Sequence, residues 1–214
     1  MVNQRKYALE LLTDANLLSC KPAPTPIDNH EKFSSTGSVP PFTDVQAYRR
    51  LIGRLMYLTN NRPDITFYVQ QLTQFLAKPT ISHYIVAIII LRDIKGAQSL
   101  GLFFSSNISA HLKAFCDSDW DTCSDSRQSV TGFSVYLGNS LISWKSKKQW
   151  TISKSSCEAE YWTMATVTCE IQWLTYVLQD FKVPFEQPSL LYYDNDLARY
   201  IAVNPVFHES VRNI

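Results

Sequence analysis

Apolar side chains recur at helical spacing through most of the first half of the chain. Helices are predicted over four segments: residues 2–18, 44–59, 65–77 and 82–95. The second segment shows the pattern well, with one apolar face made by Tyr48, Leu51, Ile52, Leu55 and Leu58. The proline-rich stretch 20–26 ends the first helix, because proline lacks an amide proton, and 27–43 reads as exposed loop. A small helical bundle is therefore expected.

The pattern changes in the second half of the chain. Paired strands are predicted over three segments rich in β-branched and aromatic residues: 111–117, 130–137 and 140–145. Gly138-Asn139, between the last two, is typical of a two-residue hairpin. The remaining pattern predicts a long helix, a strand and a short helix: 156–181, 189–193 and 196–203. This order predicts an α/β fold with flanking helices.

Charge, cysteine content and the longest apolar run indicate where in the cell the protein is expected. Lys and Arg outnumber Asp and Glu by 11 to 7 in residues 1–110, whereas acids outnumber bases by 12 to 9 in residues 111–214. Five cysteines without a CxxC pair indicate neither a disulfide framework nor a zinc site. The first residues lack the apolar core of a signal peptide, and the longest apolar run, Tyr84–Leu91, is far short of ~18 residues. We expect an intracellular protein, cytoplasmic or nuclear, without a membrane span.

Two glutamates stand at the start of the long predicted helix. Glu160 begins a stripe that continues through apolar residues at helical spacing: Met164, Val167, Ile171, Leu174 and Leu178. Glu158 lies about 200° around the helix, and its spacing from Ser155 fits a capping box, in which it would bond back to the N-cap amide. A carboxylate on a buried stripe is costly unless a metal or a buried Lys or Arg compensates it. Glu160 is therefore a candidate for either arrangement.

Aspartates cluster after the first predicted strand of the second half. Asp117, Asp119, Asp121 and Asp125 fall within nine residues, in a D-x-D-x-D spacing like that of an EF-hand loop. An EF-hand is excluded, because its sixth position is Thr122 where glycine is required and its twelfth is Gln128 where glutamate belongs. The last three aspartates are expected in a solvated turn. Asp117, at the end of a strand, has the position of a rigid site.

Asp194 also follows an apolar strand and precedes a helix. Taken alone, it is better explained as a helix N-cap. Together, Asp117, Glu160 and Asp194 could not all ionise at one place without a cation, and ligands that are all oxygen favour a hard ion such as Mg²⁺.

Lysines gather between the third strand and the long helix. Four lysines and a tryptophan precede Glu158 without an acid between them: Lys145, Lys147, Lys148, Trp150 and Lys154. The stretch is either a solvated charged loop or a nucleic-acid-binding strip, in which lysines contact phosphates and tryptophan stacks on bases. Carboxylates that bind a metal beside a basic strip indicate a phosphodiester-processing enzyme.

Longer motifs extend over nearly the whole chain. CDSDWDTCSDSRQSVTGFSVYLGNSLISWKSKKQWTISKSSCEAEY, YYDN and NPVFHE resemble the ribonuclease H domain of copia-type LTR retrotransposon Pol polyproteins. QRKYALELL, CKPAPTP, YRRLIGRLMYLTNNRPDITF and LRDIKG resemble the thumb and connection of the reverse transcriptase upstream. The resemblance implies two domains: a helical region over 1–105 and a ribonuclease H-like mixed sheet with flanking helices over 106–214.

The resemblance also implies an activity and a site. The family hydrolyses the RNA strand of an RNA/DNA hybrid with two Mg²⁺ or Mn²⁺ ions. Its catalytic, metal-binding acids fall on Asp117, Glu160 and Asp194. The family's domain continues to a further strand and to a helix bearing a fourth metal-binding aspartate, so the chain is expected to be truncated at its C-terminus. A catalytically inactive relic that at most binds nucleic acid through the lysines is the alternative.

Overall fold

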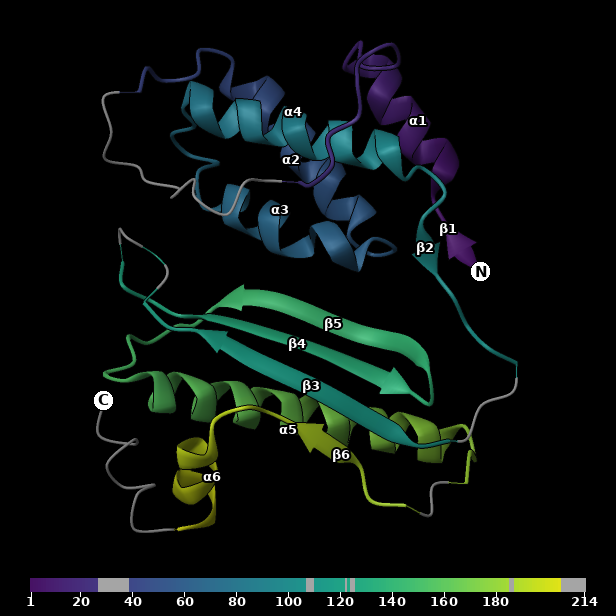
Figure 1. Ribbon diagram of the computed structural model, residues 1–214, viewed down its shortest axis with the longest axis vertical. Coiled ribbons are helices and arrows are strands. Elements are labelled where there is room, and N and C mark those ends of the chain that lie inside the picture. Colours follow the sequence, from purple (N-terminus) through teal and green to yellow (C-terminus); the bar gives the residue numbers. More distant parts are fainter. Residues whose placement is uncertain (27–38, 107–109, 122, 124–125, 185–186, 205–214) are drawn as a thin grey trace. The chain divides into compact units, whose positions relative to one another are not determined.

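The first of two units, Met1–Phe103, contains four α-helices and a two-stranded ribbon among its described residues (Figure 1). The computed structural model describes residues 1–26, 39–106, 110–121, 123, 126–184 and 187–204. Its helices in this unit are α1 (Arg5–Asp14), α2 (Val45–Leu58), α3 (Thr66–Thr73), which follows a 3₁₀ turn at Pro63–Ile65, and α4 (Ile81–Gly96). Strand β1 (Val2–Asn3) pairs antiparallel with β2 (Gly101–Leu102). Most of the predicted loop 27–43, Thr122, Asp125 and the tail after residue 204 lie outside the described residues.

The helix ends differ from the sequence expectation in two places. The first helix starts later than predicted, because Val2 and Asn3 pair with a strand almost a hundred residues away, and it ends at Asp14, where Asn16 turns the chain with φ 55° before the proline-rich stretch is reached. The third is also shorter than the predicted 65–77: Ile65 belongs to a 3₁₀ turn that starts at Pro63, and α3 ends at Thr73. Asp44 caps α2 as its side chain accepts from the amide of Ala47 at 2.8 Å.

The predicted apolar face of α2 forms the core of this unit. Tyr48, Ile52, Leu55 and Leu58 are all at most 1% exposed, and they pack with buried residues of the other three helices. Arg62 is also buried, and its guanidinium contacts the carboxylate of Asp64 at 2.6 Å.

The second unit, Phe104–Ile214, contains a four-stranded mixed sheet. Its elements are β3 (Leu112–Asp119), β4 (Val130–Leu137), β5 (Ser140–Lys148), α5 (Ser156–Asp180), β6 (Leu190–Tyr192) and α6 (Asp196–Val203). The order across the sheet is β5-β4-β3-β6, with β6 parallel to β3 and the other pairs antiparallel. Gly138 turns the β4–β5 hairpin with φ 58°. The expected mixed sheet with flanking helices is confirmed.

Helix α5 runs along one face of this sheet (Figure 1). Met164 and Val167 are buried, and the later members of the predicted stripe pack partly buried against the same core. The sheet supplies Leu112, Ala114 and Val135 to that core. Helical phase read from the sequence was therefore correct along α5. No helix within the described ranges is both long and apolar enough to cross a membrane.

The lysine-rich stretch is not a loop up to Lys148. Strand β5 runs three residues beyond the predicted 140–145, and Lys145, Lys147 and Lys148 pair with Phe133, Thr131 and Val130 of β4. The prediction of a charged loop was wrong there, because lysine is common on the exposed edge strand of a sheet, which β5 forms.

Candidate metal centre

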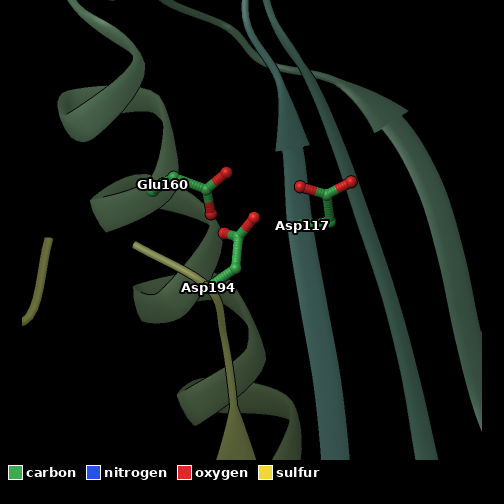
Figure 2. Close-up of side chains that lie close together, drawn as sticks. All are labelled: Asp117, Glu160 and Asp194. Atoms are coloured by element: carbon green, nitrogen blue, oxygen red, sulfur yellow. The ribbon is translucent and has the colours of Figure 1, made fainter. Parts of the chain in front are cut away.

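Three carboxylates from different parts of the second unit meet near the ends of strands β3 and β6. Asp117 lies on β3, Glu160 on α5, and Asp194 between β6 and α6 (Figure 2). One carboxylate oxygen from each lies within 4.8 Å of the others. The structure thus brings together the three acids singled out in the sequence.

The parallel pairing of β3 with β6 aligns the two aspartates. Phe115 of β3 is the register partner of Tyr192 of β6. Asp117 and Asp194 each follow two residues later, so both stand at the same end of adjacent strands with the same side-chain alternation. The parallel register, which the local sequence does not reveal, therefore brings the two carboxylates close.

Glu160 reaches the same point from the buried face of α5. Its side chain is only 5% exposed, and Oε1 accepts a hydrogen bond from the backbone amide of Ser118 at 2.9 Å. Oε2 is buried and finds no hydrogen-bond partner among the described residues. The pKa of Glu160 is raised to about 7, chiefly by burial and also by the charges of Asp117 and Asp194, while the hydrogen bond from the Ser118 amide lowers it.

No Lys or Arg in the described ranges forms an ion pair with Glu160, so the alternative of a buried salt bridge is wrong for that part of the chain. An acid beside two others, with one buried oxygen unsatisfied, is the arrangement that a cation would complete. The donors are all carboxylate oxygens, which fits Mg²⁺ or Mn²⁺ better than softer metals.

The neighbouring Glu158 has a structural role. Ser155 is the N-cap of α5, and its Oγ accepts from the amide of Glu158 at 3.2 Å. The carboxylate of Glu158 accepts from the amide of Lys154 at 2.7 Å, one residue earlier than the capping box predicts. Glu158 thus stabilises the helix start, as expected, but through a different amide.

Asp194 does not cap α6. Asn195 does so, because its Oδ1 accepts from the amides of Leu197 at 3.0 Å and Ala198 at 3.2 Å. The N-cap alternative for Asp194 is therefore wrong, and its exposed carboxylate belongs to the acidic cluster. The signal was present in the sequence, because asparagine is among the most favoured N-cap residues.

The other aspartates that the structure describes lie outside the cluster. Asp119 is the last residue of β3, and Asp121 follows in a turn with φ 55°. Both are exposed. The expected solvated turn is confirmed for Asp121, whereas Asp119 still belongs to the strand.

A buried polar network behind Glu160 was missed in the sequence. The amide nitrogen Nε2 of Gln149 donates to the carbonyl of Ala159 at 3.0 Å and to Oγ1 of Thr131 at 3.0 Å. Thr131 in turn contacts Thr163 of α5 at 2.9 Å, and the Ser153 hydroxyl donates to Gln149 at 3.2 Å. The network ties the segment after β5 to the first turns of α5, and so it fixes the backbone next to Glu160.

The predicted nucleic-acid-binding residues divide into two groups. Lys145, Lys147, Lys148 and Trp150 line one hollow beside α5. Lys147 Nζ lies 4.9 Å from the ring centroid of Trp150, which is 85% exposed. Lys154 is exposed near the N-cap of α5 and is not part of that lining.

The chain is similar over its whole length to retrovirus-related Pol polyproteins of transposons. It is 38% identical over 213 residues to that of transposon RE1 from Arabidopsis thaliana and 29% identical over 220 residues to that of transposon TNT 1-94 from Nicotiana tabacum. All of this chain is covered in both, but it spans only 14% and 16% of the two polyproteins.

A shorter relative is covered to a greater extent. The chain is 39% identical over 172 residues to an uncharacterized mitochondrial protein of Arabidopsis thaliana. The aligned region covers 80% of this chain and 71% of the mitochondrial protein. No family model and no solved structure matches the chain. Over its whole length the chain is nevertheless homologous to one segment of the copia-type retrotransposon Pol polyproteins.

Proposed function

We propose that this segment is a metal-dependent ribonuclease H that hydrolyses the RNA strand of RNA/DNA hybrids. Asp117, Glu160 and Asp194 are its catalytic, metal-binding acids, in a ribonuclease H-like domain over 106–214. Residues 1–105 are a helical region like the thumb and connection of a reverse transcriptase. The observation that carries the proposal is the convergence of three carboxylates within 4.8 Å, from strand β3, helix α5 and the β6–α6 connection.

The three acids are suited to different parts of this task. Glu160 is held from inside the fold by the Ser118 amide, so its position is fixed before substrate arrives. Asp117 and Asp194 are exposed, which leaves the site open to a phosphodiester. Bound to these oxygens, Mg²⁺ or Mn²⁺ would neutralise the acids, polarise the phosphate and activate water.

The test is cleavage of an RNA/DNA hybrid with labelled RNA by the full chain. We expect cleavage with Mg²⁺ or Mn²⁺, none in EDTA, and none of single-stranded RNA or duplex DNA. Asp194→Asn is expected to abolish it, because the amide removes one charged ligand. Asp119→Asn, which makes the same change on β3 outside the cluster, is the matched control and is expected to retain activity.

Two outcomes would contradict the proposal in different ways. Equal residual cleavage by wild type and Asp194→Asn would mean that the acids are wrongly assigned. Hybrid binding by both proteins without metal-dependent cleavage would favour the inactive, nucleic-acid-binding alternative. A second readout is direct: Mn²⁺ is expected to raise the unfolding midpoint of wild type and not that of Asp194→Asn.

A further inference from the structure

A hollow of about 260 Å³ lies where the edge strand β5 passes α5. Two of its lysines face the helix. Lys145 pairs with Phe133, which packs in the core beneath α5, and Lys147 pairs with Thr131, which contacts Thr163 of α5. Because directly paired residues share one face of a sheet, both lysines lie on the α5 side rather than on the open side.

Helix α5 completes the hollow with Trp162 and Thr166. The indole Nε1 of Trp162 is buried and has no acceptor among the described residues. None of the residues that line the hollow is acidic. Glu170 lies one helical turn beyond Thr166, outside the lining, and its carboxylate accepts a hydrogen bond from the Ser143 hydroxyl at 2.7 Å. The hollow therefore combines lysine ammonium groups and an unmatched N–H donor, and its lining carries no counterion.

We infer that this hollow binds a backbone phosphate of a nucleic-acid strand, with the adjoining base stacked on Trp150. Lys145 and Lys147 supply the charge, and the buried indole N–H of Trp162, which has no acceptor among the described residues, is a further donor on a residue that lines the hollow. Trp150, 85% exposed at the rim, offers the flat face on which any base stacks. The inference rests on the proposed function only for the class of substrate, a nucleic acid.

The hollow is separate from the acidic cluster. Trp162 lies about 200° around α5 from Glu160, and β5 lies two strands away from β3, a spacing of about 10 Å. A strand held there would lie beside the acids without occupying their place. The lysines thus act as a subsite that orients the substrate.

Inward-facing lysines on an edge strand have another use, because they block pairing with the edge of a second molecule. The two roles differ in what replacement does. Loss of edge protection produces association of the protein, whereas loss of a phosphate contact weakens binding and lowers its dependence on salt.

The experiment measures binding of a fluorescent RNA/DNA hybrid to the full chain in EDTA, by anisotropy across a salt series. Lys145→Gln and Lys147→Gln are each expected to weaken binding several-fold and to reduce the slope of log K against log salt by about 1. Trp150→Ala is expected to weaken binding about tenfold. Lys182→Gln removes the same charge beyond the end of α5 and is expected to change the slope little.

Each contrary result has a distinct meaning. Slopes for Lys145→Gln and Lys147→Gln equal to that of Lys182→Gln, or no binding by wild type, would overturn the inference. Unchanged binding with new oligomers in size-exclusion chromatography would also overturn it, in favour of edge protection. Wild type that binds through these lysines but never cleaves would refute the ribonuclease and leave the subsite standing. Cleavage with unchanged slopes would refute the subsite alone.

Discussion

Replacing Glu160 with glutamine is expected to stabilise the metal-free protein at alkaline pH. The carboxylate is almost fully buried next to two other acids, and one of its oxygens has no partner among the described residues. Glutamine has nearly the same shape, keeps an oxygen for the Ser118 amide, and places an NH₂ donor beside Asp117 and Asp194. The substitution therefore removes a charge that the fold stabilises poorly.

The magnitude follows from the pKa. The pKa of Glu160 rises from 4.5 to about 7 in the folded chain, and that difference corresponds to about 3 kcal/mol. Since the folded pKa is the higher one, the stability that comes from the protonated form is fully present below pH 4.5 and is lost as pH rises through 7. The gain from Glu160→Gln is thus expected to be small near pH 5 and to approach about 3 kcal/mol at pH 8.

The assay is urea unfolding in EDTA at pH 5 and pH 8, followed by tryptophan fluorescence. All five tryptophans lie between residues 120 and 173, so the signal reports on the second unit. Glu158→Gln is the matched control, with the same chemical change two positions away on α5. It weakens a hydrogen bond to the Lys154 amide and is expected to destabilise by about 1 kcal/mol at pH 8.

The opposite signs make the comparison decisive. If Glu160→Gln destabilises as Glu158→Gln does, or if its effect is the same at both pH values, the buried charge is not the source of strain and the argument for a cation at this place fails. Adding Mn²⁺ is expected to reverse the order, with wild type gaining stability and Glu160→Gln gaining little.

Three further substitutions test other parts of the structure. Asn195→Ala removes the N-cap of α6 and is expected to lower stability by about 1 kcal/mol in urea unfolding, and to weaken Mn²⁺ binding because Asp194 precedes it. Gln149→Met leaves the Ala159 carbonyl and Thr131 without their donor and is expected to cost about 2 kcal/mol by the same measurement. Arg62→Met leaves Asp64 without its buried partner and is expected to lower the free energy of unfolding of the first unit by about 3 kcal/mol. Urea unfolding monitored by far-UV circular dichroism measures this loss.

The sequence predicted most reliably which face of a helix is buried, because helical periodicity alone determines it. Helical phase separated Glu160 from Glu158, and the structure has the first buried and the second at the helix cap. The same reasoning placed the apolar face of α2 in the core. In both cases a single helix carries all the information, because the residues that share a face lie three or four positions apart.

Long-range pairing set the limit of prediction. Nothing in residues 2–3 indicates that they pair with residues 101–102. The parallel register of β3 with β6, which aligns Asp117 with Asp194, depends on a crossover through the 25 residues of α5. The hydrogen-bond partners of side chains could not be predicted either. The local sequence around Gln149 indicates only a polar loop residue, whereas in the fold Gln149 contacts Thr131 and the start of α5.

The acidic cluster and the lysine-lined hollow, on two sides of α5, act on a phosphate backbone with opposite charge. The acidic cluster repels phosphates until a cation neutralises it, whereas the lysines on the β5 side attract them in any condition. Binding of a cation and binding of a hybrid to this unit therefore favour each other, and by linkage each tightens the binding of the other by the same factor.

Wild type is expected to bind a hybrid more tightly with Ca²⁺ than with EDTA at equal ionic strength. Asp194→Asn, which weakens the cation site and also removes one repelling charge, is expected to bind more tightly than wild type in EDTA and to lose most of the response to Ca²⁺. A response of equal size in both proteins would mean that the cation acts elsewhere, on the nucleic acid itself, and that the acids of β3, α5 and the β6–α6 connection do not couple to substrate.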